Sequence, residues 1–131
     1  MEIVFKRKIV LTEEDIEDLM SSAIESGGIG YWTTLDNTTD AWKDRPKDEC
    51  LAEAAAKIIL DGKELEFIID DDRTVRYLNF SNLKRGIEMF IDGGYDIYGA
   101  FVGMDVDMGQ IDAERADIII QLALFDDIIY G

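Results

Sequence analysis

The sequence contains no histidine, one cysteine and one proline among its 131 residues. Without histidine, a serine or cysteine nucleophile lacks its commonest general base. The usual structural zinc sites, which take four Cys or His ligands, are excluded as well. Because Cys50 is the single cysteine, no disulfide can form within the chain. The fold must therefore be stabilised by packing, and we expect no cofactor, no metal site and no enzyme activity.

Long apolar runs are also missing. The longest candidate, residues 118–125, is far shorter than the roughly 18–20 residues of a membrane span. The N-terminal sequence MEIVFKRKIVL alternates apolar and charged residues and lacks an apolar region of signal-peptide length before a cleavage site. We therefore expect a cytoplasmic protein that does not associate with membranes.

Negative charge is the feature that the sequence has in excess. There are 29 Asp and Glu residues against 13 Lys and Arg, for a net charge of -16. Hydrophobic residues make up 47% of the chain, which is typical of a folded domain rather than a disordered one. The length fits one domain over residues 1–131. Such a surface repels phosphates and attracts basic surfaces, so direct nucleic-acid binding is not expected.

The N-terminal half predicts two strands and two helices. The expected elements are a strand over 2–11, a helix from Thr12 to about Glu25, a strand over 29–35, a polar loop over 36–47 and a helix over 48–60. Thr12 is the expected N-cap of the first helix, and Gly27-Gly28 ends it. Trp42 falls in the surface loop, and Cys50 in the alanine-rich helix, where a buried thiol is expected. Residues 58–60 fit the end of that helix or a hairpin equally well.

The C-terminal half predicts a hairpin followed by two helices. The expected elements are strands over 65–69 and 75–80, a helix capped by Ser81 and stopped by Gly93-Gly94, an irregular stretch over 95–109 and a last helix capped by Asp112. Residues 118–125 are apolar nearly all round, which indicates the interior or a dimer interface. The order favours an α+β domain with a small, largely antiparallel sheet covered on one side by about four helices.

The surplus carboxylates are the candidate functional groups. Carboxylates three or four residues apart on a helix lie about 5–6 Å from each other, similar to phosphates along a nucleic-acid strand. The candidates are Glu13, Glu14, Glu17, Asp18 and Glu25 on the first helix, and Asp70, Asp71 and Asp72 in the hairpin turn as a second patch. An ordered array of this kind could occupy the basic groove of a nucleic-acid-binding protein. The alternative is that the charge only keeps the domain soluble, although -16 exceeds the magnitude of about 2–8 that suffices for a small domain.

Three passages taken together resemble a known kind of protein: LTEEDIEDLMSSAIESGGIGYW, SNLKRGIEMFIDGG and IDAERADIIIQLALFDDIIYG. They are similar to small acidic proteins encoded by phages and mobile elements of Gram-positive gut bacteria. Such proteins include anti-CRISPR proteins and DNA-mimicking antirestriction proteins. The resemblance implies an inhibitor in the host cytoplasm that binds a basic protein surface, such as that of a CRISPR effector nuclease, and it implies no site residue.

Two other functions stay open. One is an adaptor or assembly protein of a phage or mobile element that acts through protein–protein contacts, with a homodimer formed through residues 118–125. The other is an acidic hydrolase that uses paired carboxylates and a metal. An exposed Trp or Tyr within an acidic rim would also anchor a protein partner, although core packing accounts for most of the aromatic residues.

Overall fold

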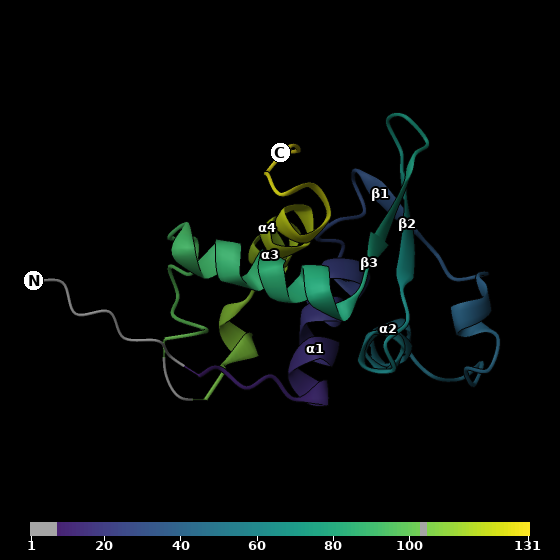
Figure 1. The fold of residues 1–131 in the computed structure, drawn as a ribbon, viewed down its shortest axis with the longest axis horizontal. Helices are drawn as coiled ribbons and strands as arrows, with labels where there is room; N and C mark the ends of the chain where they lie inside the picture. The colour runs from purple at the N-terminus through teal and green to yellow at the C-terminus, as the bar shows by residue number, and fades with distance from the viewer. Residues whose placement is uncertain (1–7, 103–104) are drawn as a thin grey trace, which may run out of the picture.

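The computed structural model describes residues 8–102 and 105–131. Within them the chain forms an α+β domain with a three-stranded antiparallel sheet and four α-helices, as the sequence predicts. The elements are α1 (Glu13–Met20), η1 (Ser21–Glu25), β1 (Thr33–Asp36), η2 (Asp40–Trp42), α2 (Leu51–Leu60), β2 (Leu65–Ile69), β3 (Val75–Leu78), α3 (Phe80–Asp92), η3 (Met108–Gln110) and α4 (Ala113–Phe125). Figure 1 shows α1, α3 and α4 on one side of the sheet, with α2 at the lower end of β2.

The sheet has the strand order β1-β2-β3. Its central strand alternates between two faces: Leu65, Phe67 and Ile69 are buried, whereas Glu66 and Ile68 are partly exposed. This period of two is the pattern of a sheet with one face on a core. The β2–β3 hairpin turn closes with hydrogen bonds between Ile69 and residues 73 and 74.

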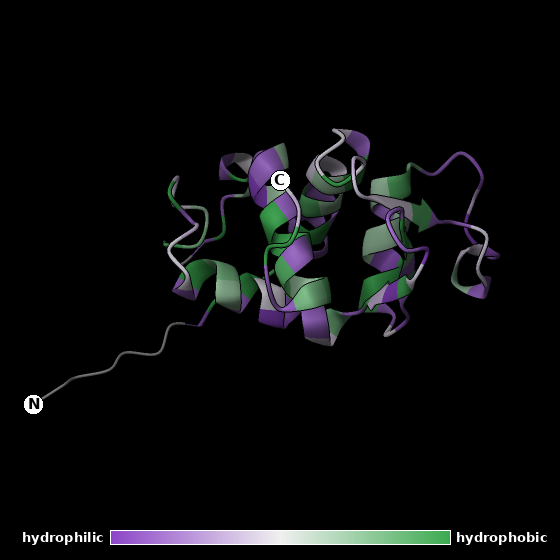
Figure 2. Cartoon of the chain, turned by 90° about the horizontal axis from the view of Figure 1, so that it is seen from above, coloured by the Kyte–Doolittle hydropathy of each residue, from purple (hydrophilic) through white to green (hydrophobic). Residues whose placement is uncertain are grey.

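Helix α4 lies in the interior. Its buried side chains include Ile119, Ile120, Leu122 and Ala123, so the apolar residues 118–125 contribute to the core of the chain itself. Hydrophilic and hydrophobic residues alternate in colour along the helices (Figure 2), as expected where a helix buries one face. Among the described residues, 8–102 and 105–131, none of the helices combines the length and the apolar character needed to span a bilayer.

Helices begin where short polar side chains accept backbone N–H groups. Thr12 caps α1 and Asp112 caps α4, as predicted. The prediction that Ser81 caps α3 is wrong, because Asn79 accepts from the Asn82 N–H at 2.9 Å while the Asn82 side chain accepts from the Asn79 N–H at 2.8 Å. This reciprocal pair satisfies two backbone N–H groups at once, and α3 therefore begins earlier in the chain than predicted.

Other sequence predictions need correction. The predicted strand over 2–11 lies mostly outside the described residues, and residues 8–11 are not in a strand. The strand predicted over 29–35 begins only at Thr33, because Ile29 and Trp32 form turns with the end of the first helical segment and with each other. The undecided residues 58–60 are helical.

Trp42 and Cys50 are placed opposite to expectation. Trp42 is buried, although the loop around it is polar, because η2 packs on α2. Cys50 is exposed, because α2 begins one residue later and leaves it at the N-cap rather than on the buried side.

Gly86 lets α3 and α4 approach closely. A Cβ at this position would lie 2.8 Å from the backbone nitrogen of Ala123 and 2.9 Å from its Cα. We expect Gly86→Ala to lower the free energy of unfolding by about 1–3 kcal/mol, because the overlap outweighs the gain of about 1 kcal/mol in helix propensity. Urea denaturation measures the change. Gly30→Ala, where no atom lies within 4 Å of the added Cβ, is the matched control, and equal stability of the two variants would contradict the close approach.

Candidate functional site

Helix α1 presents a carboxylate surface to solvent because its apolar residues occupy the other side. Ile16, Leu19 and Met20 are buried, and this spacing turns Glu13, Glu14, Glu17 and Asp18 outward. The capping box between Thr12 and Asp15, with bonds of 3.1 and 2.9 Å, fixes where the helix begins. Carboxylates in the first turn are also favoured by the helix dipole.

Helix α2 packs against α1 and completes this surface. An open hollow between the two helices is lined by Thr12, Glu13, Glu14, Glu17 and Asp18 from α1 and by Glu53 and Lys57 from α2. We call Glu13, Glu14, Glu17, Asp18 and Glu53 the α1–α2 acidic face. Four of the five predicted helix carboxylates thus meet around one hollow. Glu53 and Lys57 were missed in the sequence analysis. Their helical spacing can be read from the sequence, but the side of α2 that faces α1 is determined by tertiary packing.

The positive charge of Lys57 is balanced by neighbouring carboxylates, so it adds little net positive charge to the hollow. Its Nζ lies 2.7 Å from Glu49 Oε2 and 3.1 Å from Glu53 Oε1. Hydrogen bonds to Glu49 and then to Glu53 raise the pKa of Lys57 to about 12. The lysine is therefore charged but balanced by two carboxylates, and the surface as a whole stays negative.

Glu17 experiences the field of the surrounding carboxylates. Its pKa is raised, first by burial and then by repulsion from Glu53, Asp18 and the two glutamates of the first turn. The carboxylate oxygens of Glu17 and Glu53 and the Sγ of Cys50 lie within 4.8 Å of one another. These are ligand types that zinc accepts, but a structural zinc site has four ligands and this partly exposed group offers three.

Glu25 has a different position from the rest of the predicted set. Its Oε1 accepts the Ala52 N–H at 3.1 Å, and its Oε2 accepts the Ser21 hydroxyl at 3.3 Å. Ala52 is in the first turn of α2, where backbone N–H groups have no partner within the helix. Glu25 therefore supports the start of α2 and does not line the hollow.

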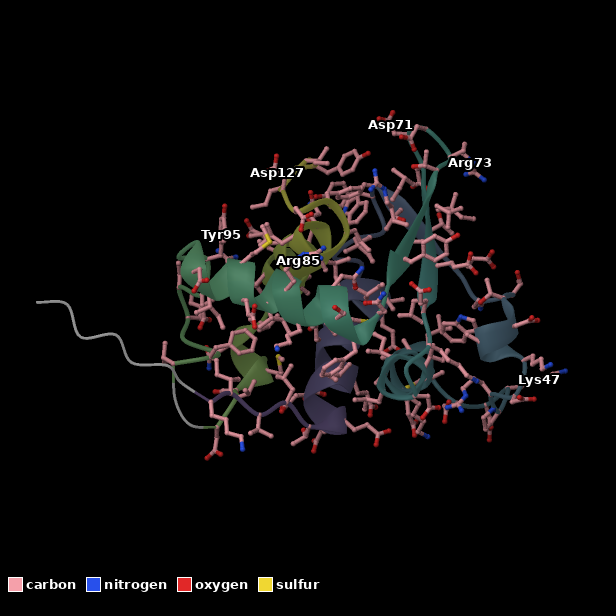
Figure 3. The ribbon with its side chains drawn as sticks, viewed as in Figure 1. Lys47, Asp71, Arg73, Arg85, Tyr95 and Asp127 are labelled. Atoms are coloured by element: carbon pink, nitrogen blue, oxygen red, sulfur yellow. The ribbon has the colours of Figure 1, made fainter. Side chains whose placement is uncertain are left out.

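The three aspartates of the hairpin turn form a separate patch. Figure 1 shows the tip of the β2–β3 hairpin at the end of the molecule opposite to the first turn of α1, and Figure 3 shows Asp71 pointing outward there, with Asp127 toward the same end. Asp70 accepts the Thr34 hydroxyl at 3.0 Å, and Asp72 accepts both the N–H and the hydroxyl of Thr74 at 3.0 and 2.6 Å. The bonds from Thr74 lower the pKa of Asp72. The two predicted patches do not make one continuous array.

No family model matches this chain, and neither does a curated protein or a solved structure.

Replacing Glu17 by Gln is expected to stabilise the fold at neutral pH. A raised folded-state pKa means that the stability associated with Glu17 is complete below its ordinary value of 4.5 and is lost as pH rises through the raised value. Glu17→Gln removes that loss, so its thermal unfolding midpoint should exceed the wild-type value at pH 7 and low salt. The difference should shrink in high salt and vanish toward pH 4.

Asp44→Asn removes one exposed carboxylate from the loop beside α2 and serves as the control. A Glu17→Gln midpoint at or below that of Asp44→Asn would show that the carboxylates around Glu17 do not repel it.

Proposed function

We propose that the protein is a non-enzymatic inhibitor whose α1–α2 acidic face binds the basic, nucleic-acid-binding groove of a host-defence nuclease. The observation that carries this proposal is the convergence of five carboxylates on one hollow between two packed helices. A charge that served only solubility would not need to gather there.

The geometry of the face supports recognition of a cationic groove. On α1, Glu13 and Glu17 are four residues apart, as are Glu14 and Asp18, so neighbouring carboxylates lie at about the spacing of phosphates on one strand. Both helices pack on the core, and the backbone that carries these side chains is held in place before binding. Preorganised charges cost less entropy to bind than charges on a mobile tail.

The class of target comes from the resemblance to acidic anti-defence proteins of phages. A groove that holds nucleic acid presents Lys and Arg side chains along a strand, and a competitor with similarly spaced anions would displace that strand. Within residues 118–125 only Ile118 and Phe125 are partly exposed, which supports the inhibitor proposal over the alternative homodimer through this segment. The inhibitor proposal therefore uses the face on which the carboxylates of α1 and Glu53 of α2 converge.

A cleavage assay tests the proposal. A purified, guide-loaded CRISPR effector of the Cas9 type cuts a labelled DNA duplex while this protein is added. We expect inhibition that excess duplex relieves, and that weakens by about tenfold or more between 50 and 200 mM salt, because charge pairs dominate the contact. The variant Glu14→Lys, Glu17→Lys, Asp18→Lys should need at least tenfold more protein for half inhibition.

The matched control is the triple variant Asp44→Lys, Asp48→Lys, Asp92→Lys. It changes the net charge by the same amount at exposed positions outside the hollow. Unfolding midpoints of both variants show whether each is folded. Equal loss of inhibition by the two folded triples would mean that total charge matters and the face does not, whereas wild-type protein without inhibition would reject this target class.

A further inference from the structure

The geometry points to a peptide-binding site on α4 that the chain fills with its own residues 128–131. We call these residues the strap, and Trp32, Gln121 and Phe125 the strap site. The expected ligand is an extended peptide of a partner protein with an aromatic side chain and an adjacent basic residue. This site is separate from the α1–α2 acidic face and does not depend on the proposed inhibition.

Gln121 binds the strap through its main chain. Its Oε1 accepts the N–H groups of Ile129 and Tyr130, both at 2.8 Å, and its Nε2 donates to the Tyr130 carbonyl at 3.2 Å. A single side-chain amide thus satisfies three backbone groups of one short segment. Main-chain contacts of this kind give affinity without fixing the sequence of the bound segment, as in strand-addition complexes.

An aromatic cage supplies the specificity. The Tyr130 ring stacks on Trp32 with centroids 5.3 Å apart and an angle of 8°, and it meets the Phe125 ring edge-on at 6.0 Å. Arg76 lies over Phe125 at 5.1 Å. The site therefore selects an aromatic residue beside the two amides that Gln121 binds.

The site is held in shape by Asp117 rather than by the strap. This buried carboxylate accepts the Trp32 indole N–H at 2.7 Å and the Gln121 amide at 2.9 Å on the same oxygen, and the Tyr31 hydroxyl at 2.5 Å on the other. Trp32 and Gln121 are thereby positioned by groups outside the strap. If the strap leaves, its binding partners remain in place.

The strap is joined to α4 by a turn and is not part of a helix or strand. Asp126 has a left-handed backbone at φ 57°, and the Arg85 guanidinium holds its carboxylate at 2.7 Å, so the end of α4 is fixed independently of residues 128–131. The charge around the Tyr130 phenol indicates which residue should stand next to the aromatic residue in a bound peptide. Asp70, Asp71 and Asp72 act on this phenol, and together they outnumber Arg76. A lysine or arginine beside the aromatic residue would complement them.

The test uses the full-length chain with Tyr130→Ala, which removes the ring stack but keeps the main-chain bonds to Gln121, so the strap is held less tightly and a peptide in trans can displace it. The probe is a synthetic peptide of sequence Ile-Ile-Tyr-Lys-Lys, and the readout is the NMR signal of the Trp32 indole N–H. We expect saturable shifts with a dissociation constant at least tenfold below that of wild-type protein, in which the strap competes at an effective concentration of order millimolar. Ile129→Ala is the matched control, because that side chain is 56% exposed and its loss leaves the strap seated.

Adding Gln121→Leu to Tyr130→Ala should abolish peptide binding. A folded Tyr130→Ala variant that gives no shift up to millimolar peptide would overturn the proposal, and so would a concentration-dependent dimer without peptide, which would make a second copy the occupant. Hydrogen exchange of the wild-type chain gives a measurement that needs no variant. The Ile129 and Tyr130 amides should exchange at least tenfold faster than the Leu122 amide, and exchange of all three only by global unfolding would reject a releasable strap.

Discussion

The close packing of α1 against α2 is the constraint on which the acidic face depends. Four alanines of α2, at positions 52, 54, 55 and 56, are buried, and side chains this small let two helices approach closely. The approach partly buries Glu17 and brings Glu53 toward it in spite of their repulsion, and both effects, burial first, raise the pKa of Glu17. Burial of apolar side chains such as Ile16 and Ile59 opposes this repulsion. The core therefore determines where the surface charge is concentrated.

The carboxylates of the chain fall into two groups by what they contact. Many of them accept backbone N–H groups and build the fold: Asp15, Glu25, Asp36, Asp72, Asp96, Asp107 and Asp112. Each takes the place of water at a helix start or turn, and its charge is part of the local structure. The other group includes Glu13, Glu14, Glu17 and Asp18, which line the hollow. The net charge counts both groups alike. The number of carboxylates that line the hollow is therefore a better measure of the charge available to a partner.

Sequence periodicity predicted most of the fold because it depends on local rules. Apolar spacing located the helices and the hairpin, and Thr12 and Asp112 acted as the caps that their side chains indicated. The start of α3 at Asn79 rather than Ser81 is a local failure, and the others concern tertiary contacts. Trp42 is buried by α2 despite its polar neighbours, and Asp117 and Gln121 look like polar interruptions of an apolar helix until Trp32 and the strap are placed against them. Glu25 was predicted on the acidic face because helical spacing cannot reveal that α2 begins beside it.

The two sites that we propose, at the two ends of the molecule, would recognise partners through different physical interactions. The α1–α2 acidic face offers charge at fixed spacing, so its affinity should fall steeply with salt and its partner must be basic over a broad area. The strap site offers one buried amide and an aromatic cage, whose hydrogen bonds and ring stack are insensitive to salt. Because the hairpin aspartates act electrostatically on the Tyr130 phenol and the hairpin tip lies away from the first turn of α1, we group them with the strap site. Their charge tunes which aromatic segment is held there, and it does not extend the array on the helices.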